Sequence, residues 1–125
     1  EEIGVGIRTK SNKKTMFSKE KRKQWLELIF KDEPKISVAV YEGLTINFCK
    51  TIGAKYILRG IRFVSDFEYE KTIADANRTL DNSIETIFLT CEPKYTSIAS
   101  TIVRDILKNG GDASQFLPME VNKDV

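Results

Sequence analysis

The stretch KYILRGIRFVSDFEYE, residues 55–70, predicts a strand, a glycine turn and a helix in immediate succession. Its first part, residues 55–60, has the apolar and aromatic side chains typical of a strand. Ser65 followed by Glu68 has the spacing of a capping box and predicts a helix that runs to about Leu80. A strand that leads directly into a helix sets the pattern for the rest of the chain.

Apolar segments on both sides of this stretch predict that the same unit recurs. Strands are expected at residues 3–7, 35–41, 55–60 and 84–90. Helices are expected at residues 18–32, 44–52, 65–80 and 97–108. Alternation favours a parallel sheet, because each crossover returns the chain to the same direction. The sequence therefore predicts an α/β fold, a Rossmann-like parallel sheet of about four strands with helices on both faces.

Local signals place the ends of these helices. Ser18 offers an N-cap to the first helix, which we expect to end near Asp32, before Pro34. Gly53 occupies the position of a C-cap glycine after the second helix. Residues 113–118, ASQFLP, add at most one helical turn.

Length and composition are those of one globular domain that spans residues 1–125. The chain has 41% hydrophobic and 30% charged residues. Its net charge of +2 is too small for a protein whose main role is to coat a nucleic acid. No apolar run is long enough for a transmembrane helix and none resembles a signal peptide, so we expect a cytoplasmic protein with no membrane partner.

Cysteine and histidine usage restricts the chemistry. Cys49 and Cys91 are far apart and belong to no CxxC pair, so we expect two reduced, small core residues and no metal site. The absence of histidine excludes catalytic triads, metal sites and acid–base chemistry that need an imidazole among these residues.

Polar segments follow each predicted strand, where parallel sheets place their binding crevice. These segments are residues 8–14, 41–45, 59–62 and 91–101, and we expect all of them to converge on one site. Arg59 and Arg62 flank a glycine and suit two anionic groups, although surface arginines can also simply solvate a loop. Hydroxyl residues in the segment YTSIAST, residues 95–101, suit an anion at a helix start, or plain helix capping. Neither a P-loop nor a GxGxxG pattern is present.

These motifs together resemble a known family. The stretch LRGIRFVSDFEYE, with ADANR, SNKKTMF and TSIASTIVR, is similar to the bacterial phosphopantetheine adenylyltransferases of the nucleotidyltransferase superfamily. The resemblance covers essentially the whole chain. It implies transfer of an adenylyl group from ATP to 4'-phosphopantetheine, which gives dephospho-coenzyme A and pyrophosphate in coenzyme A biosynthesis. It also implies Mg2+ as cofactor, a homohexamer, and coenzyme A as a feedback ligand.

The resemblance implies roles for individual residues. Three cations would act in catalysis: Lys13, Arg59 and Arg62. Phosphopantetheine would lie along Lys13, Leu44, Thr45, Arg59 and Asn77. ATP would lie against Gly60, Ile61, Arg62, Glu70, Tyr95, Thr96, Ser97, Ile98, Ala99, Ser100 and Thr101. Lys14 is the alternative to Lys13 as phosphate ligand, and Ala99 lacks a hydroxyl that many relatives carry.

One departure from the family pattern affects activity. The family has a glycine-rich TFDPxxxGH-type segment whose histidine stabilises the reacting phosphate, and this sequence contains neither. We expect roughly 30 residues of the family's first strand and helix to be missing at the amino end. Two alternatives therefore stay open: a module that binds ATP or coenzyme A without turnover, and a sister nucleotidyltransferase with another phosphorylated acceptor.

Overall fold

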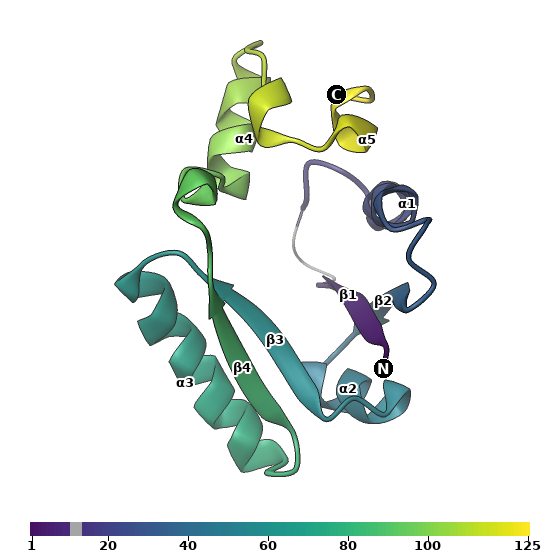
Figure 1. Cartoon of the computed structure of the whole chain (residues 1–125), viewed down its shortest axis with the longest axis vertical. Helices are drawn as coiled ribbons and strands as arrows, with labels where there is room; N and C mark the ends of the chain where they lie inside the picture. The colour runs from purple at the N-terminus through teal and green to yellow at the C-terminus, as the bar shows by residue number, and fades with distance from the viewer. Residues whose placement is uncertain (11–13) are drawn as a thin grey trace. The chain divides into compact units, whose positions relative to one another are not determined.

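Strands and helices alternate along the chain, which confirms the predicted α/β class (Figure 1). The structure is a computed structural model that describes residues 1–10 and 14–125. The strands are β1 (Ile3–Thr9), β2 (Ile36–Glu42), β3 (Tyr56–Ile61) and β4 (Glu85–Thr90). The helices are α1 (Lys19–Ile29), α2 (Thr45–Ile52), α3 (Val64–Leu80), α4 (Ser100–Lys108) and α5 (Met119–Asn122), with short 3-10 turns η1 (Pro93–Tyr95) and η2 (Ser114–Phe116).

The chain divides into two compact units. Unit 1 comprises Glu1–Glu42 and Ile98–Val125, and unit 2 comprises Gly43–Ser97. Each unit contains two strands and at least two helices, so each has the layered α/β character on its own. That residues 1–125 form a single domain stays a prediction.

The strands pair in parallel within each unit. In unit 1, β1 pairs with β2 from Ile3↔Ile36 to Thr9↔Glu42, and α1 packs against both strands. In unit 2, β3 pairs with β4 from Tyr56↔Glu85 to Ile61↔Thr90, and α3 packs against both strands. Parallel pairing and helical cover are confirmed. The described residues form two separate two-stranded sheets, whereas the sequence predicted one sheet of about four strands.

Two of the predicted helix boundaries in the first half of the chain are confirmed and one is wrong. The hydroxyl of Ser18 accepts a hydrogen bond from the backbone N–H of Lys21 at 3.1 Å, as an N-cap does. Gly53 closes α2 in the left-handed conformation, with φ of 71°. The first helix ends at Ile29 and not near Asp32, because the next residue, Phe30, leaves the helical conformation, with φ of −102° and ψ of 15°.

The predicted capping box at Ser65 and Glu68 is wrong. Helix α3 begins at Val64, because the carboxylate of Asp66 accepts hydrogen bonds from the backbone N–H groups of Arg62 and Phe63, at 3.0 and 3.1 Å. A carboxylate in the first turn satisfies amides that have no partner inside the helix and suits the helix dipole. The capping carboxylate therefore lies in the first turn of α3 and holds the backbone of Arg62.

The fourth long helix also starts later than predicted. Helix α4 begins at Ser100 and not at Ser97, because the 3-10 turn η1 and the extended residue Ala99, with φ of −142° and ψ of 144°, come first. The predicted turn in residues 113–118 is confirmed as η2. No helix among the described residues is both long enough and apolar enough to cross a lipid bilayer.

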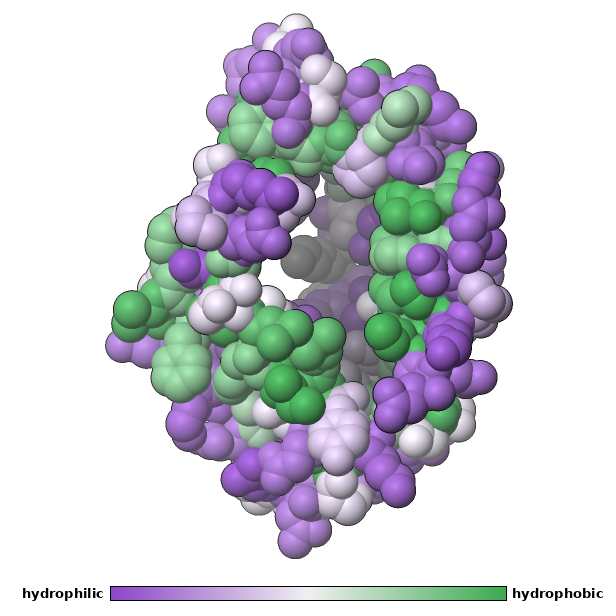
Figure 2. Space-filling view, in the orientation of Figure 1, coloured by the Kyte–Doolittle hydropathy of each residue, from purple (hydrophilic) through white to green (hydrophobic). Residues whose placement is uncertain are grey.

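The core of unit 2 is built around Ile46, Cys49 and Ile84, with Ala54 and Ile57 packed against them. Cys49 is a buried core residue, as predicted, and burial raises the pKa of its thiol. Cys91 is only half-buried, and its sulfur lies 3.9 Å from the hydroxyl of Thr96. Figure 2 shows that apolar side chains also reach the surface over α3 and the β3–β4 pair.

In unit 1, Trp25 is buried on the inner face of α1. Its indole Nε1 donates a hydrogen bond to a carboxylate oxygen of Asp124 at 2.8 Å, and the ring of Phe17 packs edge-on against it. Lys21 forms an ion pair with the same carboxylate at 2.9 Å. These contacts fix the end of the chain, beyond α5, to α1.

Candidate active site

Two arginines at the end of β3 are each held by an acidic residue of α3. The guanidinium of Arg59 donates two hydrogen bonds to Glu70, from Nε to Oε2 at 2.8 Å and from Nη2 to Oε1 at 2.7 Å. A bidentate contact of this kind fixes the orientation of the planar guanidinium as well as its position. The Arg59 side chain is 53% exposed and that of Glu70 only 13%, so the carboxylate supports the arginine from the protein side.

Arg62 is held differently. Its Nη1 donates to the backbone carbonyl of Thr96 at 3.3 Å, and its Nε lies 3.7 Å from the carboxylate of Asp66. Its guanidinium also lies 5.5 Å from the centre of the Phe63 ring. The structure therefore joins the turn after β3 to the segment after β4, two regions predicted to bind ATP.

Gly60 and Ile61 contribute backbone to this turn. A Cβ atom placed on Gly60 would meet no other atom within 4 Å, so the space beside this residue is open. The side chain of Ile61 is buried, and its carbonyl accepts a hydrogen bond from the N–H of Cys91 at 3.0 Å. A ligand could therefore approach the main chain at Gly60, whereas the buried side chain of Ile61 would not contact it.

Three of the residues predicted along phosphopantetheine, Leu44, Thr45 and Asn77, lie at or on two helices of unit 2. Leu44 is the exposed N-cap of α2, and Thr45 is its half-buried first residue. Asn77 is half-buried on α3, seven residues after Glu70, so both lie on the same side of the helix. This is the side of α3 that Arg59 reaches from β3.

The predicted ATP segment, residues 95–101, divides between the two units. Tyr95, Thr96 and Ser97 belong to unit 2, where the ammonium of Lys94 lies 4.9 Å from the centre of the Tyr95 ring. Residues 98–101 belong to unit 1, and Ala99 precedes the first turn of α4 without a side-chain cap. The first-turn amides of α4 therefore have no hydroxyl or carboxylate partner at the N-cap position.

Sequence reasoning and structure agree on part of this site. The structure brings together Arg59 with Glu70 and Arg62 with Thr96, all predicted site residues. Lys13 lies outside the described residues, and Lys14 is exposed. That all four loops converge on one site stays a prediction. Asp66 was not predicted as a site residue. The signal that could have indicated it is its position in the first turn of a helix, four residues after Arg62, where an acidic side chain can pair with the arginine.

Comparison with known proteins identifies the family of this chain. Residues 2–106 match the family model described as cytidylyltransferase-like. A phosphopantetheine adenylyltransferase of Flavobacterium psychrophilum is 51% identical over 121 residues, which are 97% of this chain and 80% of the relative. The chain belongs to the phosphopantetheine adenylyltransferase family. The resemblance inferred from the sequence motifs is therefore confirmed.

Other members of this family are equally similar. The phosphopantetheine adenylyltransferase of Phocaeicola vulgatus is 52% identical, over 94% of this chain and 78% of the relative. That of Bacteroides thetaiotaomicron is 50% identical, over 98% of this chain and 82% of the relative. Membership of the phosphopantetheine adenylyltransferase family makes the β3–α3 turn, with its two supported arginines, the candidate for the phosphate-handling part of an active site.

Proposed function

We propose that this chain transfers the adenylyl group of ATP to 4'-phosphopantetheine and so forms dephospho-coenzyme A and pyrophosphate. The observation that carries the proposal is the pair of guanidinium groups at the end of β3, one supported by Glu70 and the other by Thr96 and Asp66. Two anionic substrates repel each other, and fixed cations near both phosphates lower the free energy of bringing them together.

The reaction needs no nucleophile from the protein. A phosphate oxygen of phosphopantetheine attacks the α-phosphorus of ATP in line, and the bond from that phosphorus to the β-phosphate oxygen breaks to release pyrophosphate. In this scheme Arg59 binds the phosphate of the acceptor and Arg62 the phosphates of the nucleotide. Lys13 would add a third cation on the acceptor side.

The remaining predicted residues divide between the two substrates. We assign Leu44, Thr45 and Asn77 to the pantetheine arm, in line with their place on α2 and on the Arg59 side of α3. We assign residues 95–101 to ATP, with Ser100 as hydroxyl donor. The first-turn amides of α4 support this assignment, because amides without a capping side chain attract phosphate oxygens.

Magnesium would accompany the nucleotide. The described residues contain no group of three or more His, Cys, Asp or Glu side chains placed to hold a metal ion. Mg2+ usually keeps several waters and binds to substrate phosphates through few protein ligands, so we propose that it enters bound to ATP. The steps assigned above to the chain's own residues do not depend on it.

The family resemblance supports three further proposals. We propose that the chain acts in the cytoplasm, that it assembles as a homohexamer, and that coenzyme A binds as a feedback ligand. The apolar side chains exposed over α3 and the β3–β4 pair are compatible with burial in an assembly. Light scattering after size-exclusion chromatography, with and without coenzyme A, measures both the assembly and its response.

The main proposal is tested by incubating the chain with ATP, Mg2+ and 4'-phosphopantetheine and weighing the products by mass spectrometry. The Flavobacterium psychrophilum relative serves as positive control, and a version of the chain extended at its amino end is measured in parallel. Dephospho-coenzyme A together with pyrophosphate is the expected result. Product with nicotinate mononucleotide or glycerol phosphate as acceptor, but not with phosphopantetheine, would replace the proposal with a sister reaction.

A further inference from the structure

One carboxylate oxygen of Asp66 contacts both the backbone and the side chain of Arg62. This oxygen, Oδ2, accepts hydrogen bonds from the backbone N–H groups of Arg62 and Phe63, at 3.0 and 3.1 Å. It also lies 3.7 Å from Nε of the Arg62 guanidinium, which is within the range of an ion pair. The backbone and the side chain of this arginine are therefore held from the same point on α3.

The far end of the Arg62 side chain is held by the segment that follows β4. Its Nη1 donates a hydrogen bond to the backbone carbonyl of Thr96 at 3.3 Å, whereas its Nε faces Asp66. A guanidinium is planar and rigid, so contacts at two of its nitrogens define the direction of all its N–H groups. The Arg62 side chain is 32% exposed, so part of it stays accessible to a ligand.

The carboxylate of Asp66 also occupies the amino end of α3. The first amides of a helix have no partner inside the helix, and for this reason they attract phosphate groups. Here the amides of Arg62 and Phe63 already bind a carboxylate oxygen. A phosphate that approaches this turn would therefore meet the guanidinium of Arg62 and not these two amides.

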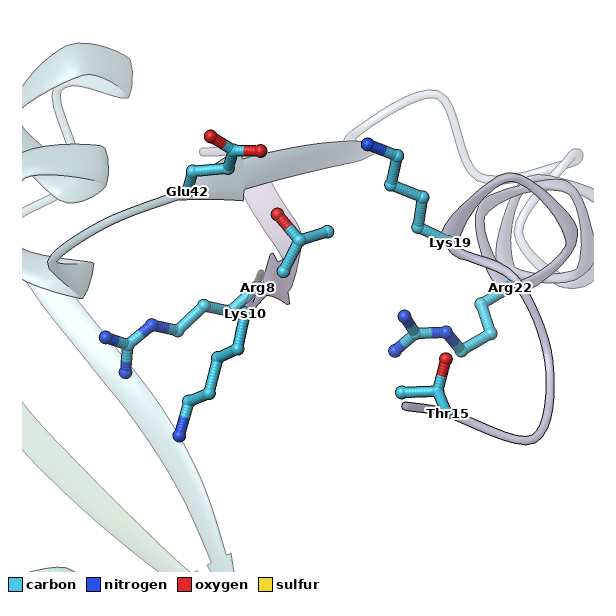
Figure 3. A pocket seen from close by; sticks show the side chains of 7 residues that line it. Arg8, Lys10, Thr15, Lys19, Arg22 and Glu42 are labelled. Carbon is cyan, nitrogen blue, oxygen red and sulfur yellow. The ribbon is translucent and has the colours of Figure 1, made fainter. Parts of the chain in front are cut away.

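Support by an acidic residue is not a general property of basic residues near strand ends. In unit 1, a pocket of about 300 Å³ near the carboxyl ends of β1 and β2 is lined by four basic side chains, Arg8, Lys10, Lys19 and Arg22. Arg8 and Lys10 point away from the space that Arg22 faces (Figure 3). No ion pair among the described residues involves any of the four. An acidic support therefore distinguishes the arginines of the β3–α3 turn from these side chains.

We propose that Asp66 is a positioning residue for the nucleotide, because its carboxylate orients Arg62 toward the phosphates of ATP. This inference rests on the proposed function, in which Arg62 binds those phosphates. Helix α3 then supplies one acidic residue to each arginine, Glu70 to Arg59 and Asp66 to Arg62. A carboxylate alone would repel a phosphate, but two amides and a guanidinium offset the charge of Asp66. Asp66 acts through Arg62 and not by contact with the substrate.

Three substitutions of Asp66 separate the orientation of Arg62 from the capping of α3. Asp66→Asn keeps an acceptor oxygen for the two amides but removes the charge that faces Nε of Arg62. Asp66→Glu keeps the charge, and a glutamate at this third position of the helix can bond the amide of the N-cap residue, Phe63. Asp66→Ala removes both the charge and the cap.

We expect the asparagine variant to bind ATP more weakly without a matching loss of stability. Calorimetric titration of the full chain with ATP and Mg2+ should give a Kd about fivefold to tenfold higher for Asp66→Asn, because no charged partner orients the donor. Asp66→Glu should restore most of the affinity. Asp66→Ala should lose affinity and also have the lowest thermal unfolding temperature of the three. The Kd for 4'-phosphopantetheine, whose phosphate we assign to Arg59, should stay unchanged in the asparagine and glutamate variants.

Asp75→Asn is the matched control, because it removes an ion pair of 2.8 Å with Lys71, four residues earlier on the same helix. It should leave the affinity for ATP unchanged. An unchanged ATP affinity in Asp66→Asn would overturn the inference. Tighter ATP binding would overturn it as well, because the carboxylate would then compete with ATP for Arg62. A loss of affinity for both substrates would reduce Asp66 to a structural role.

The titration needs no turnover, so it separates this inference from the proposed function. A chain that binds ATP but forms no dephospho-coenzyme A would contradict the proposed function, and the comparison of the Asp66 variants would still decide the role of Asp66. A chain that does not bind ATP would overturn both.

Discussion

Glu70 on α3 fixes the guanidinium of Arg59 on β3 through two hydrogen bonds of 2.8 and 2.7 Å. The two residues are eleven positions apart, and the turn between them contains Gly60 and Arg62. The carboxylate is shielded and the guanidinium faces outward, so the pair presents an oriented cation at the end of the strand. Glu70, predicted from the sequence to contact ATP, has an additional role in the structure as the support of Arg59.

Glu70→Gln should lower the catalytic efficiency toward phosphopantetheine by about tenfold, because the amide has one acceptor oxygen and no charge with which to orient Arg59. Stability should change by less than about 1 kcal/mol, since the pair is partly exposed. The measurements are steady-state kinetics of an active form and urea unfolding. Asp75→Asn, which removes an ion pair with Lys71 on the same helix, is the control. Equal losses in both variants would argue against a support role.

Arg59→Ala should lower turnover by about a hundredfold or more, because a charge-assisted contact to a reacting phosphate contributes about 2.7–4 kcal/mol to the transition state. The control is Arg78→Ala, which removes the ion pair between Arg78 and Glu85 near the other end of α3. Pyrophosphate release measures the rate of each variant. Near-normal turnover of Arg59→Ala would remove this residue from the mechanism.

Gly60→Ala should fold normally but bind ATP at least several-fold more weakly. The added Cβ meets no protein atom within 4 Å, so it projects into the space that we assign to the nucleotide. Gly53→Ala is the reciprocal control, because φ of 71° makes a side chain unfavourable there by about 1–2 kcal/mol. Gly60→Ala should therefore lower the affinity for ATP without lowering the thermal unfolding temperature. Gly53→Ala should lower the thermal unfolding temperature without changing the affinity for ATP. Unchanged ATP affinity in Gly60→Ala would place the nucleotide elsewhere.

Asp124→Asn should make the fold less sensitive to acid. The hydrogen bond from Trp25, and then the one from Lys21, lower the pKa of Asp124 in the folded chain. Because this pKa is below that of the unfolded chain, the ionised carboxylate stabilises the fold at pH values above the usual Asp pKa of about 3.9. The contribution is lost as the pH falls through the folded-state pKa.

The fluorescence of Trp25, the chain's single tryptophan, measures this effect in urea unfolding between pH 7 and pH 3. We expect the variant to be less stable than the unmodified chain at pH 7 and the difference to shrink toward pH 3. A constant difference across this range would show that Asp124 acts through packing and not through its charge. Lys23→Gln, on the same helix but without contact to Asp124, should leave the pH dependence unchanged.

Local signals were sufficient where a few neighbouring residues decide the structure. Ser18 as an N-cap and Gly53 as a C-cap were predicted correctly, because each acts on backbone groups within one turn. The capping box at Ser65 was wrong, because the carboxylate of Asp66 reaches the preceding amides first. Two candidate caps one residue apart cannot be ranked from spacing alone.

The sequence by itself determined the family, the alternation of strands and helices, and the set of arginines and hydroxyl residues at the strand ends. These features depend on residue type and on spacings within one element. Only the tertiary structure decided that Glu70 holds Arg59, that Thr96 holds Arg62, and that the cations of β1 and α1 share one pocket. Such partners are brought together by the packing of different elements, and side-chain contacts across that packing leave no periodic signal in the chain.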